Sequence, residues 1–117
     1  MPIPLIDSFH ARGVPVAQVY GTTETAPIAV YQRREDARRS PGSTGKPALH
    51  CDLRIIDDAG QDVPAGERGE VLIRGPNVMS HYWRNREATA AALRDGWFHT
   101  GDVGNLDDEG DLWIDAR

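Results

Sequence analysis

The second half of the sequence is a series of short, strand-like runs separated by turn residues, and this pattern limits the chain to a fold rich in β-structure. Residues 53–57 alternate between apolar and polar side chains, residues 58–60 (DAG) are a turn sequence, and residues 69–74 form a second strand pattern. Further along, residues 103–106 and 112–115 flank the turn sequence DDEG, which predicts a hairpin. We therefore expect hairpin-like pairing throughout this half.

The first part of the chain is expected to hold a helix followed by a strand. Apolar residues at positions 5, 6, 9 and 11 recur at near-helical spacing, Gly13 stands where a helix C-terminal cap is expected, and Pro15 follows it. Residues 16–20 are rich in β-branched and aromatic side chains, which predicts a short buried strand that enters a turn at Gly21. Residues 32–47 are polar and contain Arg, Ser, Gly and Pro, so we expect them to connect two subdomains.

One short surface helix is expected over residues 85–93. The segment is rich in alanine and other good helix formers, Asn85 can cap its N-terminus, and Gly96 can close its C-terminus. The chain therefore combines a few helices with a larger number of strands.

Charge and composition exclude several classes of protein. The chain has 13 Lys and Arg against 18 Asp and Glu, a formal net charge of −5, so nucleic acid is not an expected partner. No apolar run approaches the roughly 20 residues that cross a bilayer, and the start lacks the apolar core of a secretory signal. Cys51 is the single cysteine, which rules out an internal disulfide and fits a reducing cytosol. We expect a soluble, cytoplasmic protein without a transmembrane segment.

Three runs resemble the signatures of one enzyme family. Residues 19–25 read VYGTTET, residues 69–75 read GEVLIRG with Tyr82-Trp83 after them, and residues 97–102 read WFHTGD. Together, and in this order, they resemble the signatures of the acyl-adenylate-forming (AMP-binding) superfamily, of the acyl-CoA synthetase or fatty-acid–CoA ligase type. Family members commonly carry glycine where His81 stands and proline where Arg86 stands, which puts local backbone geometry in question rather than the nucleotide contacts.

The resemblance covers residues 5–117, whereas family members are several times longer, so we expect the chain to be an internal fragment. It implies an α/β (α+β) fold in two pieces. Residues 1–42 would be the edge of a sheet-containing α/β subdomain that carries the adenine and magnesium motif. Residues 43–117 would be a small, distorted β-barrel-like unit that ends just before the hinge to a C-terminal domain absent here.

The resemblance also assigns roles to the run at residues 19–25. Tyr20 would stack on adenine, Thr23 would donate its hydroxyl to the α-phosphate, and Glu24 would help to hold Mg²⁺, a cation that prefers carboxylate and water oxygens. Thr23 and Glu24 are thus the candidate catalytic residues. Gly21 would permit close approach of the backbone, and Thr22 belongs to the same nucleotide-contacting set.

Four further residues complete the implied nucleotide site. Asp102 is assigned to the ribose, because one carboxylate can accept hydrogen bonds from two vicinal hydroxyls. Arg117 stands at the spacing at which a family arginine also reaches the ribose. Gln18 and Val19 match positions that line the acyl and AMP pocket.

The implied activity is a two-step ligation that uses ATP, Mg²⁺ and coenzyme A, with a fatty acid as the expected carboxylic acid. Two alternatives stay open: an adenylation module that loads a carrier protein, and a non-catalytic remnant that acts only in association through exposed fragment edges. The family's phosphate loop and its C-terminal lysine are absent from this sequence. We therefore expect the isolated chain to be inactive, because such charge-stabilising groups are often each worth about 10² to 10³ in rate.

Overall fold

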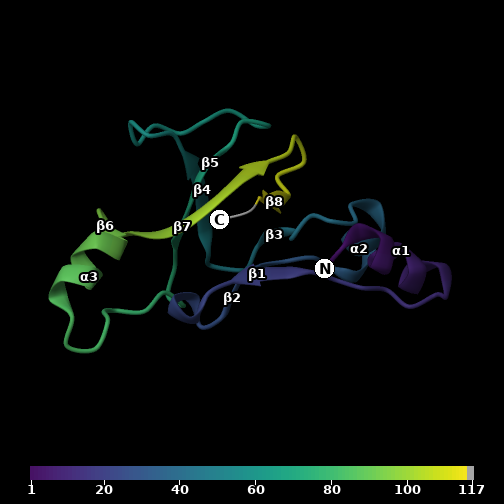
Figure 1. The fold of residues 1–117 in the computed structure, drawn as a ribbon, viewed down its shortest axis with the longest axis horizontal. Helices are drawn as coiled ribbons and strands as arrows, with labels where there is room; N and C mark the ends of the chain where they lie inside the picture. The colour runs from purple at the N-terminus through teal and green to yellow at the C-terminus, as the bar shows by residue number, and fades with distance from the viewer. Residues whose placement is uncertain (116–117) are drawn as a thin grey trace.

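The structure, a computed structural model, describes residues 1–115 and contains two antiparallel sheets (Figure 1). The first sheet has the order β1 (Val19–Gly21), β2 (Ile28–Tyr31) and β3 (Lys46–Pro47). The second has the order β4-β5-β7-β6, with β8 also paired to β7. Its strands are β4 (Asp52–Ile56), β5 (Gly69–Arg74), β6 (Leu93–Arg94), β7 (Trp97–Leu106) and β8 (Leu112–Ile114).

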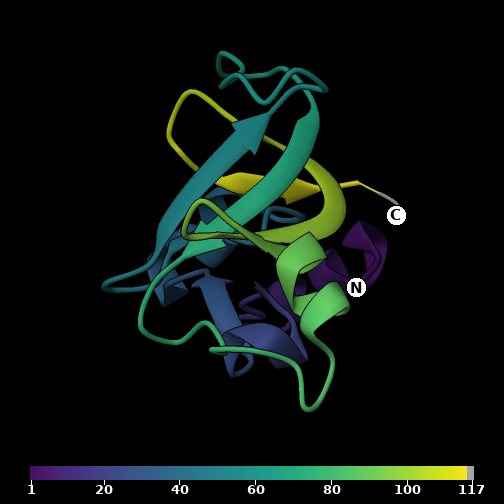
Figure 2. The same ribbon diagram turned by 90° about the vertical axis from the view of Figure 1, so that its left-hand side faces the viewer.

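The second sheet is strongly curled, and its longest strand is responsible. β7 pairs with β5 over one part of its length and with β8 over another, and Figure 2 shows that it bends between them. The register between β5 and β7 shifts between Glu70 and Leu72, and Gly101 of β7 has φ +74°. Such irregularities bend a strand and increase its twist. The expected β-rich, barrel-like unit is therefore confirmed as a curled sheet.

The hydrophobic core lies between the two sheets. Ile55, Val71 and Ile73 occupy alternate positions on β4 and β5, so their side chains share one face of the second sheet. They pack with Ala29 and Val30 of the first sheet, and each of the five is at most 4% exposed. The two strands predicted over residues 53–57 and 69–74 thus supply three side chains of the core.

Of the three α-helices within residues 1–115, two were predicted from the sequence. α1 (Ile3–Ala11) ends at Arg12, and Gly13 follows with φ +77° and donates its N–H to the His10 carbonyl, as a glycine after a helix commonly does. α3 (Arg86–Ala92) begins after Asn85, whose Oδ1 accepts from the Ala88 N–H at 3.0 Å. The predicted cap residues at these two positions are confirmed.

Three expectations about secondary structure are wrong in detail. The first strand begins at Val19 rather than at residue 16, and it is not buried, because Val19 is 53% exposed. The expected connection over residues 32–47 contains α2 (Arg34–Arg39) and β3. Gly96 does not close α3. Instead, Asp95 (φ 54°) and Gly96 (φ 81°) form the two-residue turn between β6 and β7. Asp-Gly is a favoured sequence for such a turn.

The two sheets are joined by main-chain hydrogen bonds. The Thr44 N–H donates to the Leu112 carbonyl at 2.8 Å, and the Leu112 N–H donates to the Gly45 carbonyl at 2.7 Å. The division of the chain into units at residues 42 and 43 stays a prediction.

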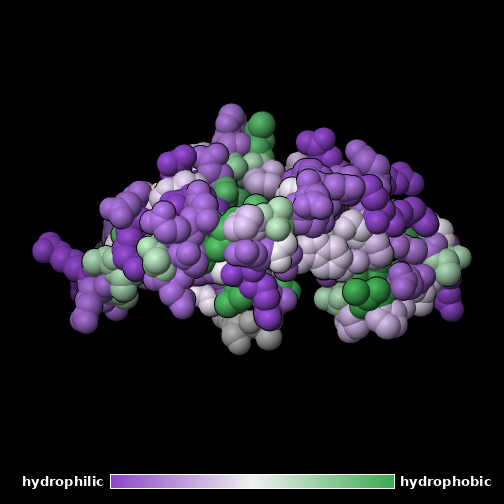
Figure 3. All heavy atoms as spheres, turned by 90° about the horizontal axis from the view of Figure 1, so that it is seen from above, coloured by the Kyte–Doolittle hydropathy of each residue, from purple (hydrophilic) through white to green (hydrophobic). Residues whose placement is uncertain are grey.

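The molecule is elongated, with principal extents of 49 × 30 × 24 Å. α1 and α2 lie at one end and α3 at the other (Figure 1). Seen from above, hydrophobic side chains reach the surface in separate patches among hydrophilic ones (Figure 3). Within residues 1–115, no helix is both long and apolar enough to cross a membrane.

Candidate functional site

The candidate phosphate and metal residues lie in a single 3₁₀ turn, Thr23–Thr25, that follows β1. The Thr25 side chain is fully buried and holds this turn from inside: its Oγ1 accepts from the Thr22 N–H at 2.9 Å and lies 2.8 Å from the Pro27 carbonyl, to which it can donate. Thr23 is exposed and Glu24 is half-buried. The turn therefore presents a hydroxyl and a carboxylate side by side at the end of a strand.

The backbone around position 21 leaves room only for glycine. A Cβ atom at this position would lie 1.6 Å from the Pro27 carbonyl oxygen, which no side chain can tolerate. The missing side chain lets the backbone return directly from the turn into β2. The predicted close approach of backbone to a nucleotide stays a prediction.

Two residues 82 positions apart meet beside this turn. The Tyr20 hydroxyl donates a 2.6 Å hydrogen bond to Oδ2 of Asp102, which lies in β7 and is only 2% exposed. The Asp102 N–H donates to Oγ1 of Thr100 at 3.0 Å, which fixes the backbone that carries the carboxylate. The structure thus brings together the predicted adenine platform and the predicted ribose acceptor.

Glu24 has a hydrogen-bond partner that no pattern in the sequence predicts. The Tyr82 hydroxyl donates to Oε2 of Glu24 at 2.9 Å, across a sequence separation of 58 residues. Burial, together with the neighbouring Glu24 carboxylate, raises the pKa of Tyr82, so its phenol keeps its proton at neutral pH. Tyr82 was noted in the sequence only as part of a family signature.

The remaining candidate residues are placed as follows. Gln18 is half-buried and its Nε2 donates to the Ser43 carbonyl at 3.3 Å, so its side chain contacts the junction of the sheets. Val19 is exposed at the first position of β1. Thr22 is half-buried, and the predicted role of Arg117 lies outside the described residues.

A buried glutamine that the sequence analysis did not single out supports this arrangement. Gln32 is 4% exposed; its Oε1 accepts from the Gln18 N–H at 2.9 Å, and its Nε2 donates to Ser43 Oγ at 2.9 Å. It fixes the start of β1 relative to the segment before β3. A lone glutamine in a polar run carries no pattern that would reveal this role.

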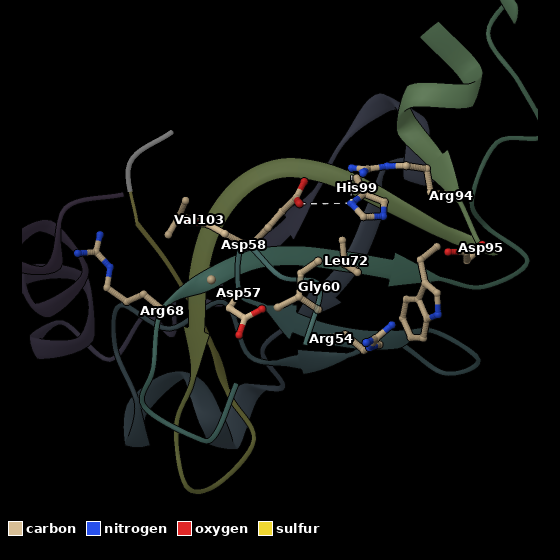
Figure 4. A pocket seen from close by; sticks show the side chains of 14 residues that line it. Arg54, Asp57, Asp58, Gly60, Arg68, Leu72, Arg94, Asp95, His99 and Val103 are labelled. Carbon is tan, nitrogen blue, oxygen red and sulfur yellow. Dashed lines mark hydrogen bonds and ion pairs between the residues drawn. The ribbon is translucent and has the colours of Figure 1, made fainter. Parts of the chain in front are cut away.

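A separate hollow lies on the other face of the second sheet, away from the core (Figure 4). Arg54 and Arg74 both lie over the ring of Trp97, with the guanidinium carbons 5.2 and 4.4 Å from its centroid. His99 lies on the same face, and its Nδ1 is 3.3 Å from Oε2 of Glu70. Basic and acidic side chains both line the hollow, and His99 pairs there with Glu70. The hollow therefore has no single charge that would select a ligand.

Comparison with known proteins assigns the chain to a family. Residues 1–83 match the family model of the AMP-binding enzymes. The chain belongs to the AMP-binding enzyme family. This match confirms the resemblance that the three sequence runs predicted.

Two CoA-linked enzymes are similar to this chain in sequence over most or all of its length. The chain is 56% identical over its whole length to indoleacetate–CoA ligase of Aromatoleum aromaticum, and 44% identical over 94% of its length to feruloyl-CoA synthase of an Amycolatopsis species. It spans only 23% and 22% of the length of these two relatives.

Solved structures agree with the fold. One is o-succinylbenzoate CoA synthetase from Bacillus subtilis in complex with its acyl-adenylate intermediate, with a TM-score of 0.94 at 40% identity over all of this chain and 30% of that one. The same enzyme in complex with ATP and magnesium ion gives 0.89 at 40% identity, over 97% of this chain and 24% of that one. The mixed α/β architecture of this chain is therefore the one found in these family members.

Proposed function

We propose that the chain forms the nucleotide-facing part of an ATP-dependent carboxylic acid–CoA ligase. In this reaction a carboxylate attacks the α-phosphate of ATP to give acyl-AMP and pyrophosphate, and the thiol of coenzyme A then displaces AMP. Both named relatives are CoA-linked enzymes, and the structural neighbour has been solved with an acyl-adenylate and with ATP and magnesium. These similarities favour coenzyme A over a carrier protein as the acceptor.

The hydrogen bond between Tyr20 and Asp102 is the observation that supports the proposal most directly. In a nucleotide the base is attached to the ribose, so a base platform and a ribose acceptor must be neighbours. Here Tyr20 would stack on adenine while the Asp102 carboxylate accepts from ribose hydroxyls. The other proposed contacts are Thr23 with the α-phosphate, Arg117 with the ribose, Gly21 and Thr22 with the nucleotide, and Gln18 and Val19 with the acyl and AMP pocket.

Glu24 is proposed to hold Mg²⁺, which would offset negative charge on the phosphates. Within residues 1–115 there is no group of three or more His, Cys, Asp or Glu that could hold a metal ion. A single carboxylate still fits magnesium, because this cation is usually bound by one or two carboxylates with substrate phosphates and water. The donor set of this chain therefore suits a metal that arrives with ATP.

The acid is proposed to carry an aromatic ring, because indoleacetate and ferulate, named in the two relatives, both do. A fatty acid, which the sequence resemblance favoured, is the competing proposal. Non-hydrolysable analogues of indoleacetyl-AMP and of a long-chain fatty acyl-AMP separate the two. We expect the aromatic analogue to bind the chain more tightly, and the reverse order would favour the fatty acid.

Calorimetric titration of the 117-residue chain with the aromatic acyl-adenylate analogue tests the nucleotide site. We expect saturable binding that is lost in Tyr20→Ala and in Asp102→Ala. Circular dichroism checks that each variant is folded. A folded wild-type chain that binds no analogue would contradict the proposal that these residues form a nucleotide site in this chain.

A further inference from the structure

The loop at residues 75–82, which follows β5, passes over the 3₁₀ turn and is bound to it at three points. The Met79 N–H donates to the Glu24 carbonyl at 2.8 Å, and Asn77 Nδ2 donates to the Thr25 carbonyl at 2.8 Å. The third contact is the 2.9 Å hydrogen bond from the Tyr82 hydroxyl to Oε2 of Glu24. The first two hold the backbone of the turn, and only the third holds a side chain that faces the proposed site.

Tyr82 is itself held from the other side. Its N–H donates to Oγ1 of Thr89 in α3 at 2.9 Å, and the same Thr89 hydroxyl donates to the Asn85 carbonyl at 2.8 Å. The start of α3 therefore fixes the main chain from which the phenol reaches Glu24. A donor that is fixed in this way restricts the rotation of the carboxylate that it binds.

The contact uses only one oxygen of the Glu24 carboxylate. Oε2 accepts from Tyr82, and Oε1 receives no side-chain hydrogen bond from any residue between 1 and 115. A carboxylate can bind a cation through one oxygen while the other accepts a hydrogen bond, and ligating carboxylates in proteins are commonly held in this manner. Tyr82 thus orients Glu24 without blocking it.

We propose that Tyr82 is a positioning residue, which holds the Glu24 carboxylate in the orientation that binds the divalent cation. The inference rests on the proposed function, because it takes Glu24 as the metal-binding carboxylate. It predicts that removal of one hydroxyl, far from the signature at residues 19–25 in the sequence, weakens cation binding and leaves metal-free adenylate binding intact. Loss of such supporting hydrogen bonds typically lowers metal affinity by about 10- to 100-fold.

The test is a Mn²⁺ titration, followed by electron paramagnetic resonance, of the 117-residue chain saturated with α,β-methylene-ATP. Tyr82→Phe removes only the hydroxyl. Tyr31→Phe is the matched control, since Tyr31 is 37% exposed at the end of β2 that lies farther from the 3₁₀ turn, where it pairs with Val19. Glu24→Gln measures how far the proposed ligand itself contributes. Calorimetry with the acyl-adenylate analogue in EDTA measures nucleotide binding without metal.

We expect Tyr82→Phe to raise the Mn²⁺ dissociation constant by about tenfold, Glu24→Gln to raise it further, and Tyr31→Phe to leave it unchanged. Adenylate binding in EDTA should be the same in Tyr82→Phe and in the wild type.

Mn²⁺ affinity unchanged in Tyr82→Phe but lost in Glu24→Gln would overturn the inference and leave the proposed function standing. An equal loss of adenylate binding in Tyr82→Phe would show a merely structural role. No effect of Glu24→Gln, or no Mn²⁺ binding by the wild type, would remove the metal role of Glu24 and the inference with it.

Discussion

At the scale of single residues, the buried hydrogen bond between Tyr20 and Asp102 bears on both the stability of the fold and the proposed nucleotide site. The donor and acceptor are 2.6 Å apart and Asp102 is 2% exposed, so the carboxylate has little access to water. Hydrogen bonds to charged groups contribute about 1.5–3 kcal/mol. We expect Tyr20→Phe to lower the free energy of unfolding by a similar amount, measured by urea denaturation at pH 7. Tyr31→Phe, a change at an exposed tyrosine, should differ from the wild type by less than about 0.5 kcal/mol.

The raised pKa of Tyr82 predicts that the stability of the chain depends on pH. Burial and the neighbouring Glu24 carboxylate raise the pKa of the phenol in the folded chain above the value of about 10 that it has when unfolded. The neutral phenol is the form that the folded state favours. Its contribution is therefore fully present below pH about 10 and is lost as the pH rises through the folded pKa.

Urea midpoints of the wild type and Tyr82→Phe between pH 8 and pH 11 check this sign. We expect the wild type to lose more stability than the variant above pH about 10, where the unfolded phenol ionises. Two curves that stay parallel over the whole range would show that folding does not perturb the phenol.

At the residue scale, the sequence could supply candidates but not their partners. Thr23, Glu24 and Asp102 were found because they stand in recognisable runs. The contact of Glu24 with Tyr82 joins residues 58 positions apart, and no local pattern encodes such a distance. For Gly21, close approach of the backbone to a nucleotide stays a prediction, and the contact with the Pro27 carbonyl that excludes a Cβ there became visible only in the structure.

At the level of secondary-structure elements, α2 depends on a buried acid in another part of the chain. Asp111, just before β8, is fully buried; Arg39 Nη2 of α2 lies 3.0 Å from its Oδ2, and Lys46 Nζ of β3 lies 2.8 Å from its Oδ1. One carboxylate therefore joins three elements. Removing it would leave two cations without this partner, although both are partly exposed and can be hydrated.

We expect Asp111→Ala to lower the free energy of unfolding by about 1–3 kcal/mol, less than the loss of a fully buried ion pair, because water can replace the carboxylate. Thermal and urea denaturation measure the change. Asp108→Ala, an exposed acid in the same turn, is the matched control and should be close to neutral. Equal effects of the two substitutions would mean that the bridge to α2 and β3 adds nothing to stability.

The same ion pairs explain why α2 and β3 were missed while the hairpins were found. The hairpin strands are short runs rich in apolar residues, and the turn sequences DAG and DDEG lie between them, so local chemistry and tertiary packing favour the same structure. The α2 sequence, REDARR, has no apolar face beyond Ala37, which alone is buried. Its helix is held by contacts with Asp111 72 residues away, and only the folded chain brings these together.

For the molecule as a whole, the order of three short runs was enough to predict the family, but not which surfaces stay uncovered. α1 shows the consequence. Of its apolar side chains Ile6 is 1% exposed, whereas Ile3, Leu5 and Phe9 are 41–45% exposed. Exposed apolar side chains gathered on one helix favour association.

We predict that the isolated chain self-associates through α1. Sedimentation velocity over a range of concentrations should show dimers or larger species that decrease in the double variant Leu5→Lys, Phe9→Lys, because lysine ammonium groups resist burial in an apolar contact. Asp7→Lys changes the net charge by the same amount on the same helix and should leave association unchanged. A compact monomer at all concentrations would contradict this prediction. It would also count against the reading of the chain as a remnant that acts only in association, because that reading requires uncovered apolar surface to form contacts.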